Sequence, residues 1–342
     1  MNLNKSILIR VDFNKYIGLG HIKRCINLAT IFKKNGWRIL FVCKDCEEKK
    51  KIDNTKFHFI YLKNTINEEE DGLQTIELYK KYKIKILIVD RDNFLTLNKK
   101  RQYYLFLKKV RKANILFSWD PLIYKKFNYD YIYFPYVGAK KIFRKNKKSI
   151  LGENFLIINK NFFFSRKLKN KIKNILINFG GTDKFEYLIE ILNMNIFLFY
   201  PYKIKIILFN KLNTIQIKEF KRICNLMESK VDLVINPKMI HNYYKWADLG
   251  IVSSGYSKYE ASASGLPIFL FESSNLKSKF NNFFLSKKSS FLYKKNNFAH
   301  LFNLLQNNFK LRKLMSENSR KILSINNEKR VLSFFNNIIR KY

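Results

Sequence analysis

The chain has 342 residues and a formal net charge of +40, from 66 Lys and Arg residues against 26 Asp and Glu residues. This length suits two domains of about 150 to 170 residues each, and the 47% hydrophobic content is typical of a globular protein. Every apolar run is shorter than the roughly 20 residues that a membrane-spanning helix needs.

The first half of the chain alternates apolar strands with segments of helical periodicity. The predicted helices cover residues 22–34, 68–82 and 97–112, and the predicted strands cover residues 7–9, 38–43, 57–62, 84–90, 115–119 and 131–134. Near-continuous apolar strands that alternate with helices are typical of a parallel sheet covered on both faces. Ligands bind such sheets beyond the carboxyl ends of the strands, which is where the sequence places Asp12, Asp90 and Asp120.

The pattern lapses over residues 138–172 and then resumes. The strands predicted in the second half cover residues 174–179, 203–208, 233–235, 249–252 and 268–271. Helical segments separate these strands, and several more helices follow the last strand. The sequence therefore predicts an α/β protein with two domains, residues 1–165 and 166–342.

A glycine-rich turn with a histidine joins the first strand to the first helix. Gly18 and Gly20 permit positive φ angles and the close approach of a ligand, and the first amides of the helix attract anions such as a diphosphate. The helix dipole disfavours a charged imidazolium at His21, so that a neutral imidazole is available as a general base. A loop histidine without a chemical task is the alternative.

The basic residues are spread over every segment, together with many Asn, Ile and Phe residues. This mixture indicates a codon bias toward A and T more than a dedicated basic patch. A polyanionic partner is the functional alternative, but no zinc-finger, RRM or KH pattern accompanies the charge. We therefore expect no specific nucleic-acid partner and leave open a weak association with an anionic membrane surface.

The cysteines do not form a recognisable metal or disulfide framework. Cys43 and Cys46 have the spacing of a metal or redox pair, but no second pair completes a zinc site. They lie at the end of a predicted strand, where small apolar side chains pack, so no metal or cofactor is expected. The start of the chain leads directly into a strand without a signal-peptide pattern, and the expectation is a cytoplasmic monomer.

The second half repeats the combination of glycines and hydroxyls after a strand. Gly180-Gly181-Thr182-Asp183 follows one strand, and Ser253-Ser254-Gly255, with Ser257, follows another. Backbone amides in such turns can hold a diphosphate. Glu260 begins the next helix, where a carboxylate can accept hydrogen bonds from two ribose hydroxyls. An ordinary acidic residue in a first helical turn is the alternative for Glu260.

Together these motifs resemble a known family. Arg10-x-Asp12 with Gly18-x-Gly20-His21-x-x-Arg24 resembles the opening of the hydrolases that act on UDP-2,4-diacetamido-2,4,6-trideoxy-β-L-altropyranose in pseudaminic acid biosynthesis. Residues 151–157 resemble the family's segment at the domain junction, and residues 179–183 resemble its second-domain phosphate loop. Residues 246–248 and 253–267 are similar to the nucleotide-binding stretch that the family shares with MurG-type glycosyltransferases.

The resemblance implies a GT-B fold, with two Rossmann-like doubly wound domains, an interdomain cleft and a UDP-sugar as the substrate. It implies that His21 activates the water that attacks the anomeric carbon, so that UDP leaves with inversion and without a metal or cofactor. The substrate-binding residues that it implies are Asp12, Gly18, Gly20, Arg24, Gly180, Gly181, Thr182, Asp183, Ser254, Gly255, Ser257, Glu260 and Asn275.

Two other functions remain as alternatives. A glycosyltransferase of the same fold would pass the sugar to an acceptor instead of water, and it would also use a base in the first domain. A catalytically silent or polyanion-binding protein on this scaffold is the other alternative.

The chain departs from the family's pattern at Asp92, Asn159 and Leu276, where tyrosine, arginine and glutamine are usual. A related sugar nucleotide is therefore an alternative substrate.

Overall fold

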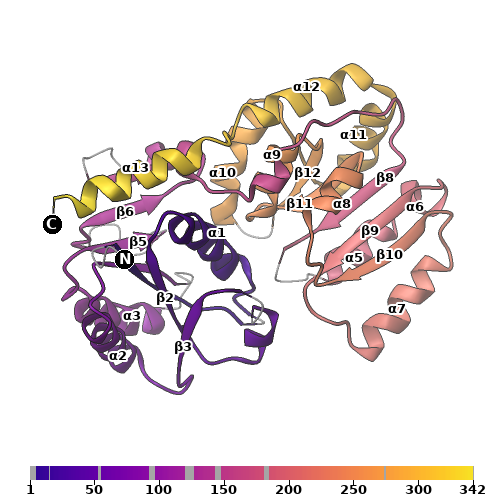
Figure 1. Ribbon diagram of the computed structural model, residues 1–342. Coiled ribbons are helices and arrows are strands. Elements are labelled where there is room, and N and C mark those ends of the chain that lie inside the picture. The colour runs from indigo at the N-terminus through magenta and orange to yellow at the C-terminus, as the bar shows by residue number, and fades with distance from the viewer. Residues whose placement is uncertain are drawn as a thin grey trace. The chain divides into compact units, whose positions relative to one another are not determined.

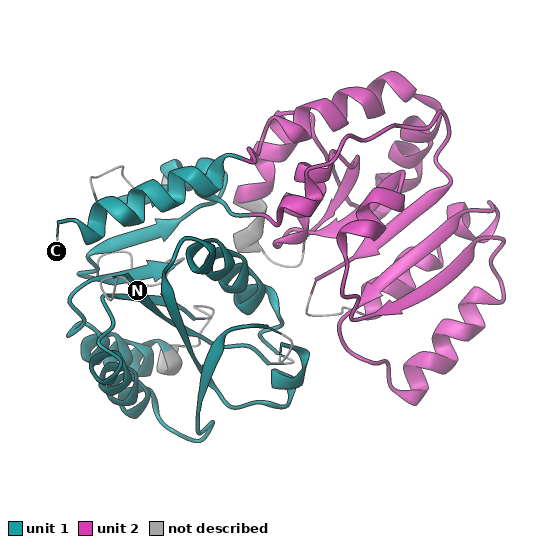
Figure 2. Ribbon diagram, viewed as in Figure 1, with its two compact units in different colours: residues 1–157, 326–342 teal, residues 158–325 magenta. Residues whose placement is uncertain are grey.

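The structure, a computed structural model, describes residues 5–14, 16–52, 55–91, 97–119, 127–142, 148–180, 185–272 and 275–341. The chain divides into two compact units (Figure 2). Unit 1 comprises residues 1–157 and 326–342, and unit 2 comprises residues 158–325. Each unit is built on its own parallel sheet with helices packed against it (Figure 1).

Unit 1 contains a seven-stranded sheet in the order β3-β2-β1-β4-β5-β6-β7. Neighbouring strands in this sheet are parallel. The elements of unit 1 are β1 (Ser6–Val11), α1 (Gly20–Lys34), β2 (Arg38–Lys44), η1 (Glu47–Lys51), β3 (His58–Leu62), α2 (Glu68–Lys81), β4 (Ile86–Asp90), α3 (Leu97–Val110), β5 (Leu116–Trp119), β6 (Tyr131–Phe134), α4 (Ala139–Ile142), β7 (Ser149–Leu151), η2 (Glu153–Phe155) and α13 (Asn327–Ile339).

Unit 2 contains a six-stranded sheet in the order β10-β9-β8-β11-β12-β13. Its neighbouring strands are also parallel. The elements of unit 2 are η3 (Lys160–Phe162), β8 (Asn174–Asn178), α5 (Phe185–Leu192), α6 (Asn195–Leu198), β9 (Lys203–Leu208), α7 (Thr214–Cys224), β10 (Lys230–Ile235), α8 (His241–Trp246), β11 (Leu249–Ser253), α9 (Ser257–Ser264), β12 (Ile268–Phe271), α10 (Asn275–Ser286), β13 (Phe291–Leu292), α11 (Lys295–Asn307) and α12 (Phe309–Arg320).

The predicted α/β class is confirmed, since strands and helices alternate in both units. The strand order changes direction between β1 and β4 in unit 1 and between β8 and β11 in unit 2. At such a switch point the connections after the two strands run to opposite faces, so that a ligand can reach the carboxyl ends of both strands. Each unit therefore has one preferred place for a site.

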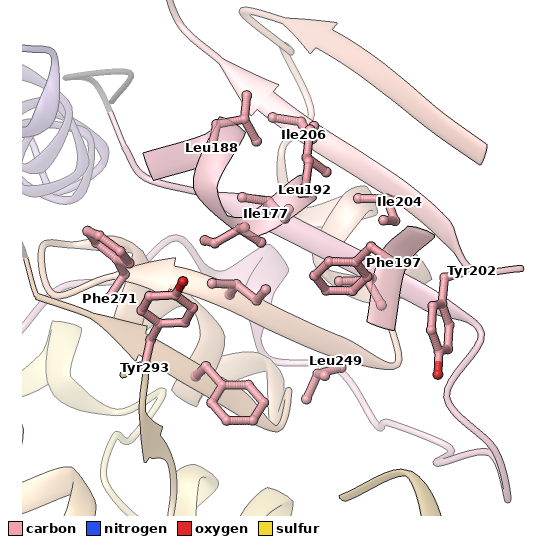
Figure 3. Close-up of a cluster of buried hydrophobic side chains, with 14 of the residues drawn as sticks. Ile177, Leu188, Leu192, Phe197, Tyr202, Ile204, Ile206, Leu249, Phe271 and Tyr293 are labelled. Atoms are coloured by element: carbon pink, nitrogen blue, oxygen red, sulfur yellow. The ribbon is translucent and has the colours of Figure 1, made fainter. Parts of the chain in front are cut away.

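The core of unit 2 lies against the apolar strands of its sheet. Residues 188, 191 and 192 repeat at helical spacing and bury one face of α5 against β8 and β9. Full burial of a Leu, Ile or Phe side chain contributes about 1.5–3 kcal/mol each, so that this face fixes α5 on the sheet. Figure 3 labels Ile177, Leu188, Leu192, Phe197, Tyr202, Ile204, Ile206, Leu249, Phe271 and Tyr293 of this cluster.

The helix α13 belongs to unit 1 although it follows unit 2 in the chain. Phe335 of α13 stacks on Phe117 of β5 with ring centroids 4.6 Å apart, and it meets Phe32 of α1 edge-on at 4.8 Å. The Asn327 side chain donates to the carbonyl of Leu156 at 3.0 Å. The structure thus differs from the expected domain of residues 166–342, because the apolar face of α13 completes the core of the first sheet.

A buried ionic network joins β1 to α2 in unit 1. The fully buried Arg10 side chain pairs with Asp12 at 2.5 Å and with Asp71 of α2 at 2.6 Å. Arg91 pairs with Asp12 at 2.9 Å and also with Glu68. Burial alone would raise the pKa of Asp71, but the attraction of Arg10 and Arg91 outweighs it and holds that pKa below its ordinary value.

Asp71→Asn is expected to lower the free energy of unfolding by about 3–5 kcal/mol, because it removes one of the two buried carboxylates that neutralise the fully buried Arg10. Since the pKa of Asp71 is lower in the folded than in the unfolded state, its stabilisation is present at neutral pH and is lost as the pH falls below about 4. Urea unfolding followed by circular dichroism, at neutral pH and below pH about 4, measures the free energy of unfolding under both conditions. Asp45→Asn, which removes the exposed pair with Lys49, is the control with little expected change. Equal destabilisation by both variants would contradict the prediction.

Candidate functional site

His21 lies near the start of α1, beside the switch point between β1 and β4. Its Nδ1 is 2.8 Å from Oδ1 of Asp90, the last residue of β4. The His21 side chain is 19% exposed, whereas the Asp90 side chain is fully buried. In the described part of the chain, Nε2 of His21 has no hydrogen-bond partner. The imidazole is thus anchored through one nitrogen and offers the other to a ligand.

Asp90 accepts hydrogen bonds from several donors. Arg24 donates through Nε to Oδ2 at 2.6 Å and through Nη2 to Oδ1, and the Cys25 thiol donates to Oδ2 at 3.1 Å. Burial alone would raise the pKa of Asp90, but Arg24 and His21 outweigh it and hold that pKa well below its ordinary value. Asp90 is therefore a carboxylate at neutral pH.

The ionised Asp90 decides which nitrogen of His21 carries the proton. Arg24 Nη2, which can only donate, lies 3.1 Å from Nδ1 of His21 and by itself would favour an unprotonated Nδ1. It already donates to Oδ1 of Asp90, and that oxygen is closer to Nδ1, at 2.8 Å. A carboxylate has no proton to donate, and an unprotonated Nδ1 would face its oxygen lone pair to lone pair. The arrangement therefore favours Nδ1–H donating to Asp90, which leaves the lone pair on Nε2. This is the tautomer that a general base needs.

Aromatic residues hold Arg24 on its other side. Arg24 Nη1 donates to the Tyr136 hydroxyl, and Nε1 of Trp119 donates to the same oxygen at 3.1 Å. The guanidinium carbon lies 5.0 Å from the centroid of the Trp119 ring. Arg24 is expected from the sequence to bind substrate, but its contacts with Asp90 and Tyr136 favour a positioning role, in which it orients Asp90.

The other binding residues expected near His21 are Asp12, Gly18 and Gly20, and the structure favours a different role for the aspartate than for the glycines. Asp12 is 7% exposed and accepts from the Lys44 amide at 3.0 Å as well as from two arginines, which favours a structural role. Gly18 has φ +77°, as a glycine turn requires. A Cβ built on Gly20 has no described atom within 4 Å, so that the start of α1 is open next to His21.

In unit 2 a serine–glycine cluster (Gly180, Ser253, Gly255, Ser257) forms where β8 and β11 end. Gly180 has φ +79°, and a Cβ built there would lie 3.5 Å from the Ser253 hydroxyl and 3.7 Å from the Ser257 hydroxyl. A Cβ on Gly255 would also lie 3.5 Å from the Ser253 hydroxyl. Among the described residues, the Ser253 hydroxyl and the Gly255 amide have no hydrogen-bond partner. A free hydroxyl and amide at the start of α9 suit an anion.

The side chain of Ser254, one of the expected substrate-binding residues, is hydrogen-bonded within the protein. Its hydroxyl donates to the Phe271 carbonyl at 2.8 Å and accepts from the Asn281 amide at 2.8 Å. Its backbone amide also donates to the Phe271 carbonyl, at 3.0 Å. The geometry therefore favours Ser253 over Ser254 as the hydroxyl available to a ligand.

Glu260 lies on the first turn of α9 and is oriented by a tyrosine. The Tyr244 hydroxyl donates to Oε2 of Glu260 at 3.2 Å, and the Asn178 side chain donates to the Tyr244 hydroxyl at 2.8 Å. Burial and the neighbouring carboxylate raise the pKa of Tyr244 well above its ordinary value. The phenol thus stays protonated and keeps donating to Glu260.

Several positions named from the sequence lie outside the described residues. They are Asp92, Asp120, Gly181, Thr182 and Asp183. The side chains of Asn275 and Leu276 are also outside the described part, although their backbone opens α10. Asn159 precedes η3 and accepts from the Asn161 amide at 3.0 Å.

Sequence reasoning missed the residues that support His21 and Glu260. Asp90 is visible as a carboxylate at a strand end, but its pairing with a histidine 69 residues away depends on β1 and β4 being neighbours. Tyr244 and Asn178 belong to no motif, so that no sequence signal marks them.

Among the residues that the structure describes, no group of three or more His, Cys, Asp or Glu side chains could hold a metal ion. Within the same residues, the helices are too short or too polar to cross a membrane.

The comparison with known sequences gives one distant relative. No protein-family model matches the chain. An uncharacterized protein of Methanocaldococcus jannaschii is 25% identical over 304 residues, which are 83% of this chain and 59% of that protein. The chain therefore spans about three fifths of the length of the curated relative that it matches.

Solved structures resemble the protein over nearly its whole length. MurG from Acinetobacter baumannii has a TM-score of 0.63 at 12% identity, over 99% of this chain and 100% of that chain. The S. aureus MnaA–UDP complex has a TM-score of 0.67 at 12% identity, over 98% and 97%. UDP-GlcNAc 2-epimerase from Neisseria meningitidis bound to UDP-GlcNAc has a TM-score of 0.63 at 12% identity, over 96% and 99%. The protein thus has the GT-B fold, built from two Rossmann-like units.

Proposed function

We propose that the protein hydrolyses a UDP-activated diacetamido-trideoxy sugar in pseudaminic acid-type nonulosonate biosynthesis. The observation that carries the proposal is the pair of His21 and Asp90, in which a buried carboxylate anchors Nδ1 at 2.8 Å and leaves Nε2 unpartnered among the described residues. The motif resemblance supports the choice of substrate. Two of the similar solved structures contain UDP or UDP-GlcNAc, which supports the choice of nucleotide.

In the proposed reaction His21 acts as the general base. Its Nε2 takes a proton from water while the water oxygen attacks the anomeric carbon on the face opposite UDP. The bond between the anomeric carbon and the diphosphate oxygen breaks, its electron pair leaves with UDP, and the anomeric configuration inverts. Asp90 stabilises the imidazolium that forms, as a buried aspartate does beside a catalytic histidine. A base of this kind contributes about 10²–10⁴ in rate.

The nucleotide is proposed to bind at the serine–glycine cluster of unit 2. The Ser253 hydroxyl and the Gly255 amide would donate to the diphosphate, and they would stabilise the charge that develops on it as UDP leaves. Glu260 would accept hydrogen bonds from the ribose hydroxyls. The sequence adds Gly181, Thr182, Asp183 and Asn275 to this proposed site.

Glu260→Ala is expected to raise the dissociation constant of UDP about 5- to 150-fold, because removing a hydrogen-bond partner costs about 1–3 kcal/mol. Isothermal titration calorimetry with UDP alone measures the change. Glu317→Ala is the matched control, since Glu317 is an exposed carboxylate on α12 of the same unit. An unchanged affinity in Glu260→Ala would remove Glu260 from the nucleotide site.

Incubation with a panel of UDP-sugars in the absence of any acceptor tests the proposed activity. We expect UDP and free sugar in equal amounts from a diacetamido-trideoxy member of the panel, with the inverted anomer appearing first by ¹H NMR. UDP release that needs an added acceptor would replace hydrolysis by glycosyl transfer. An epimeric UDP-sugar formed without UDP release would replace it by epimerisation. Salt-sensitive nucleic-acid binding without turnover would favour the polyanion-binding alternative.

A further inference from the structure

Three large apolar side chains are exposed together in unit 2. Phe199 is 68% exposed, Tyr200 is 53% exposed and Leu226 is 63% exposed. Phe199 and Tyr200 lie in the turn between α6 and β9, and Leu226 lies in the turn between α7 and β10. Exposed single apolar residues are common on proteins, but a group of them marks an interaction surface.

The two turns are hydrogen-bonded to each other. The Glu228 amide donates to the Leu198 carbonyl at 2.8 Å, and the Ser229 hydroxyl donates to the Tyr200 carbonyl at 2.6 Å. These hydrogen bonds hold side by side the two turns that carry the three exposed side chains. We call this surface the apolar tip (Phe199, Tyr200, Leu226).

A row of lysines adjoins the apolar tip. Lys203 and Lys230 are direct partners in the register of β9 and β10, and the Lys203 amide donates to the Lys173 carbonyl at 2.8 Å. All three lysines are exposed, and none forms an ion pair within the described part of the chain. Lys203 and Lys230 lie on adjacent strands about 4.8 Å apart and on the same face of the sheet. Lys173 precedes Asn174, the register partner of Lys203, and so it alternates to the other face. We call these three lysines at the strand starts the lysine row (Lys173, Lys203, Lys230). Glu228, also exposed, offsets part of this charge.

The apolar tip and the lysine row lie at the amino ends of the strands of unit 2. The serine–glycine cluster instead follows the carboxyl ends of β8 and β11. Because the strands are parallel, these two regions lie at opposite ends of the strands. A partner bound at the amino ends would leave the proposed nucleotide site uncovered.

We propose that unit 2 docks on an anionic lipid surface through the apolar tip and the lysine row. Aromatic and leucine side chains partition into the headgroup region of a bilayer, and lysines beside them attract lipid phosphates. A base-stacking nucleic-acid site has no use for an exposed leucine such as Leu226. The tip has three exposed apolar side chains, whereas a stable protein interface uses about 20–30 residues of each partner. This proposal does not depend on the proposed hydrolase activity.

Vesicle flotation of the whole protein tests the proposal. With phosphatidylcholine vesicles that contain about 30% phosphatidylglycerol we expect binding at about 0.1 M salt and much weaker binding at about 0.5 M salt. Pure phosphatidylcholine vesicles should bind little protein. Lys203→Glu with Lys230→Glu, and separately Phe199→Ser with Leu226→Ser, should each lower the partition coefficient at least about tenfold.

Matched controls separate the local surface from the overall charge. Lys295→Glu with Lys313→Glu removes the same charge from exposed positions on α11 and α12. Ile215→Ser with Met239→Ser removes two exposed apolar side chains, 77% and 60% exposed, that follow the carboxyl ends of β9 and β10. Both controls should bind vesicles as the parent does, and circular dichroism checks that every variant is folded.

Three results would overturn the proposal. The first is that the parent protein does not float with anionic vesicles. The second is that the control variants lose binding as strongly as the tip and row variants do. The third is that the protein does not bind vesicles but binds single-stranded RNA through the same lysines, which would assign this surface to nucleic acid.

Discussion

His21→Asn is expected to lower kcat for UDP-sugar hydrolysis by about 10²- to 10⁴-fold and to leave the affinity for UDP nearly unchanged. The asparagine side chain can still hydrogen-bond to Asp90, but it takes no proton from water at neutral pH. His21 belongs to unit 1, whereas the proposed nucleotide residues belong to unit 2. Continuous measurement of UDP release and calorimetry with UDP give the two quantities separately.

The matched control for this prediction is His58→Asn. His58 is an exposed histidine at the start of β3 in the same unit, and its replacement should leave kcat unchanged. A His21→Asn variant as fast as the parent would show that His21 is not the base. A large loss of UDP affinity in that variant would instead place His21 in the nucleotide site.

Asp90→Asn is expected to lower kcat by a similar factor, with a much smaller change in KM. An asparagine amide can donate to Nδ1 of His21, which stabilises the tautomer with the proton on Nε2 and removes the lone pair that accepts the proton from water. The corresponding change in the serine-protease triad lowers kcat about 10⁴-fold. Because Asp90 acts through His21, it is a positioning residue, and the split between kcat and KM measures that role.

A second buried aspartate controls for lost stability. Asp90→Asn also removes the counter-charge of Arg24, so that it destabilises unit 1. Asp71→Asn likewise breaks a buried ion pair, with Arg10, although Arg10 keeps its pair with Asp12, and Asp71 has no contact with His21. At a temperature where both variants are folded, Asp71→Asn should keep the parental kcat while Asp90→Asn does not. Equal falls in kcat would assign Asp90 a purely structural role.

The fold could be predicted where its signals are local. The apolar runs 7–9 and 84–90 predict β1 and β4, because strands buried on both faces read as continuous apolar sequence. The three-residue strand β7 is too short to show a period. The amphipathic face of α13 is visible in the sequence, but the sheet that it covers depends on Phe335 meeting Phe117, a long-range contact without a sequence signal.

The candidate site could likewise be predicted from the sequence only where it depends on neighbouring residues. The turn around Gly18 and the helix start mark His21, because that chemistry depends on neighbouring residues. The choice between Ser253 and Ser254 instead depends on the pairing of β11 with β12, which gives the hydroxyl of Ser254 to the Phe271 carbonyl. Pairing between distant strands sets which of two adjacent serines is free.

The position of α13 in the chain sets the order in which the protein can be completed during translation. Leu156 and Asn327 are hydrogen-bonded although 171 residues separate them, so that unit 2 leaves the ribosome before unit 1 receives its last helix. Until then the aromatic side chains of Phe32 and Phe117 lack the cover that Phe335 provides. Nascent chains in this state expose apolar surface that chaperones and proteases recognise. A premature stop ahead of α13 would thus spare His21 and Glu260 and still yield a protein prone to degradation.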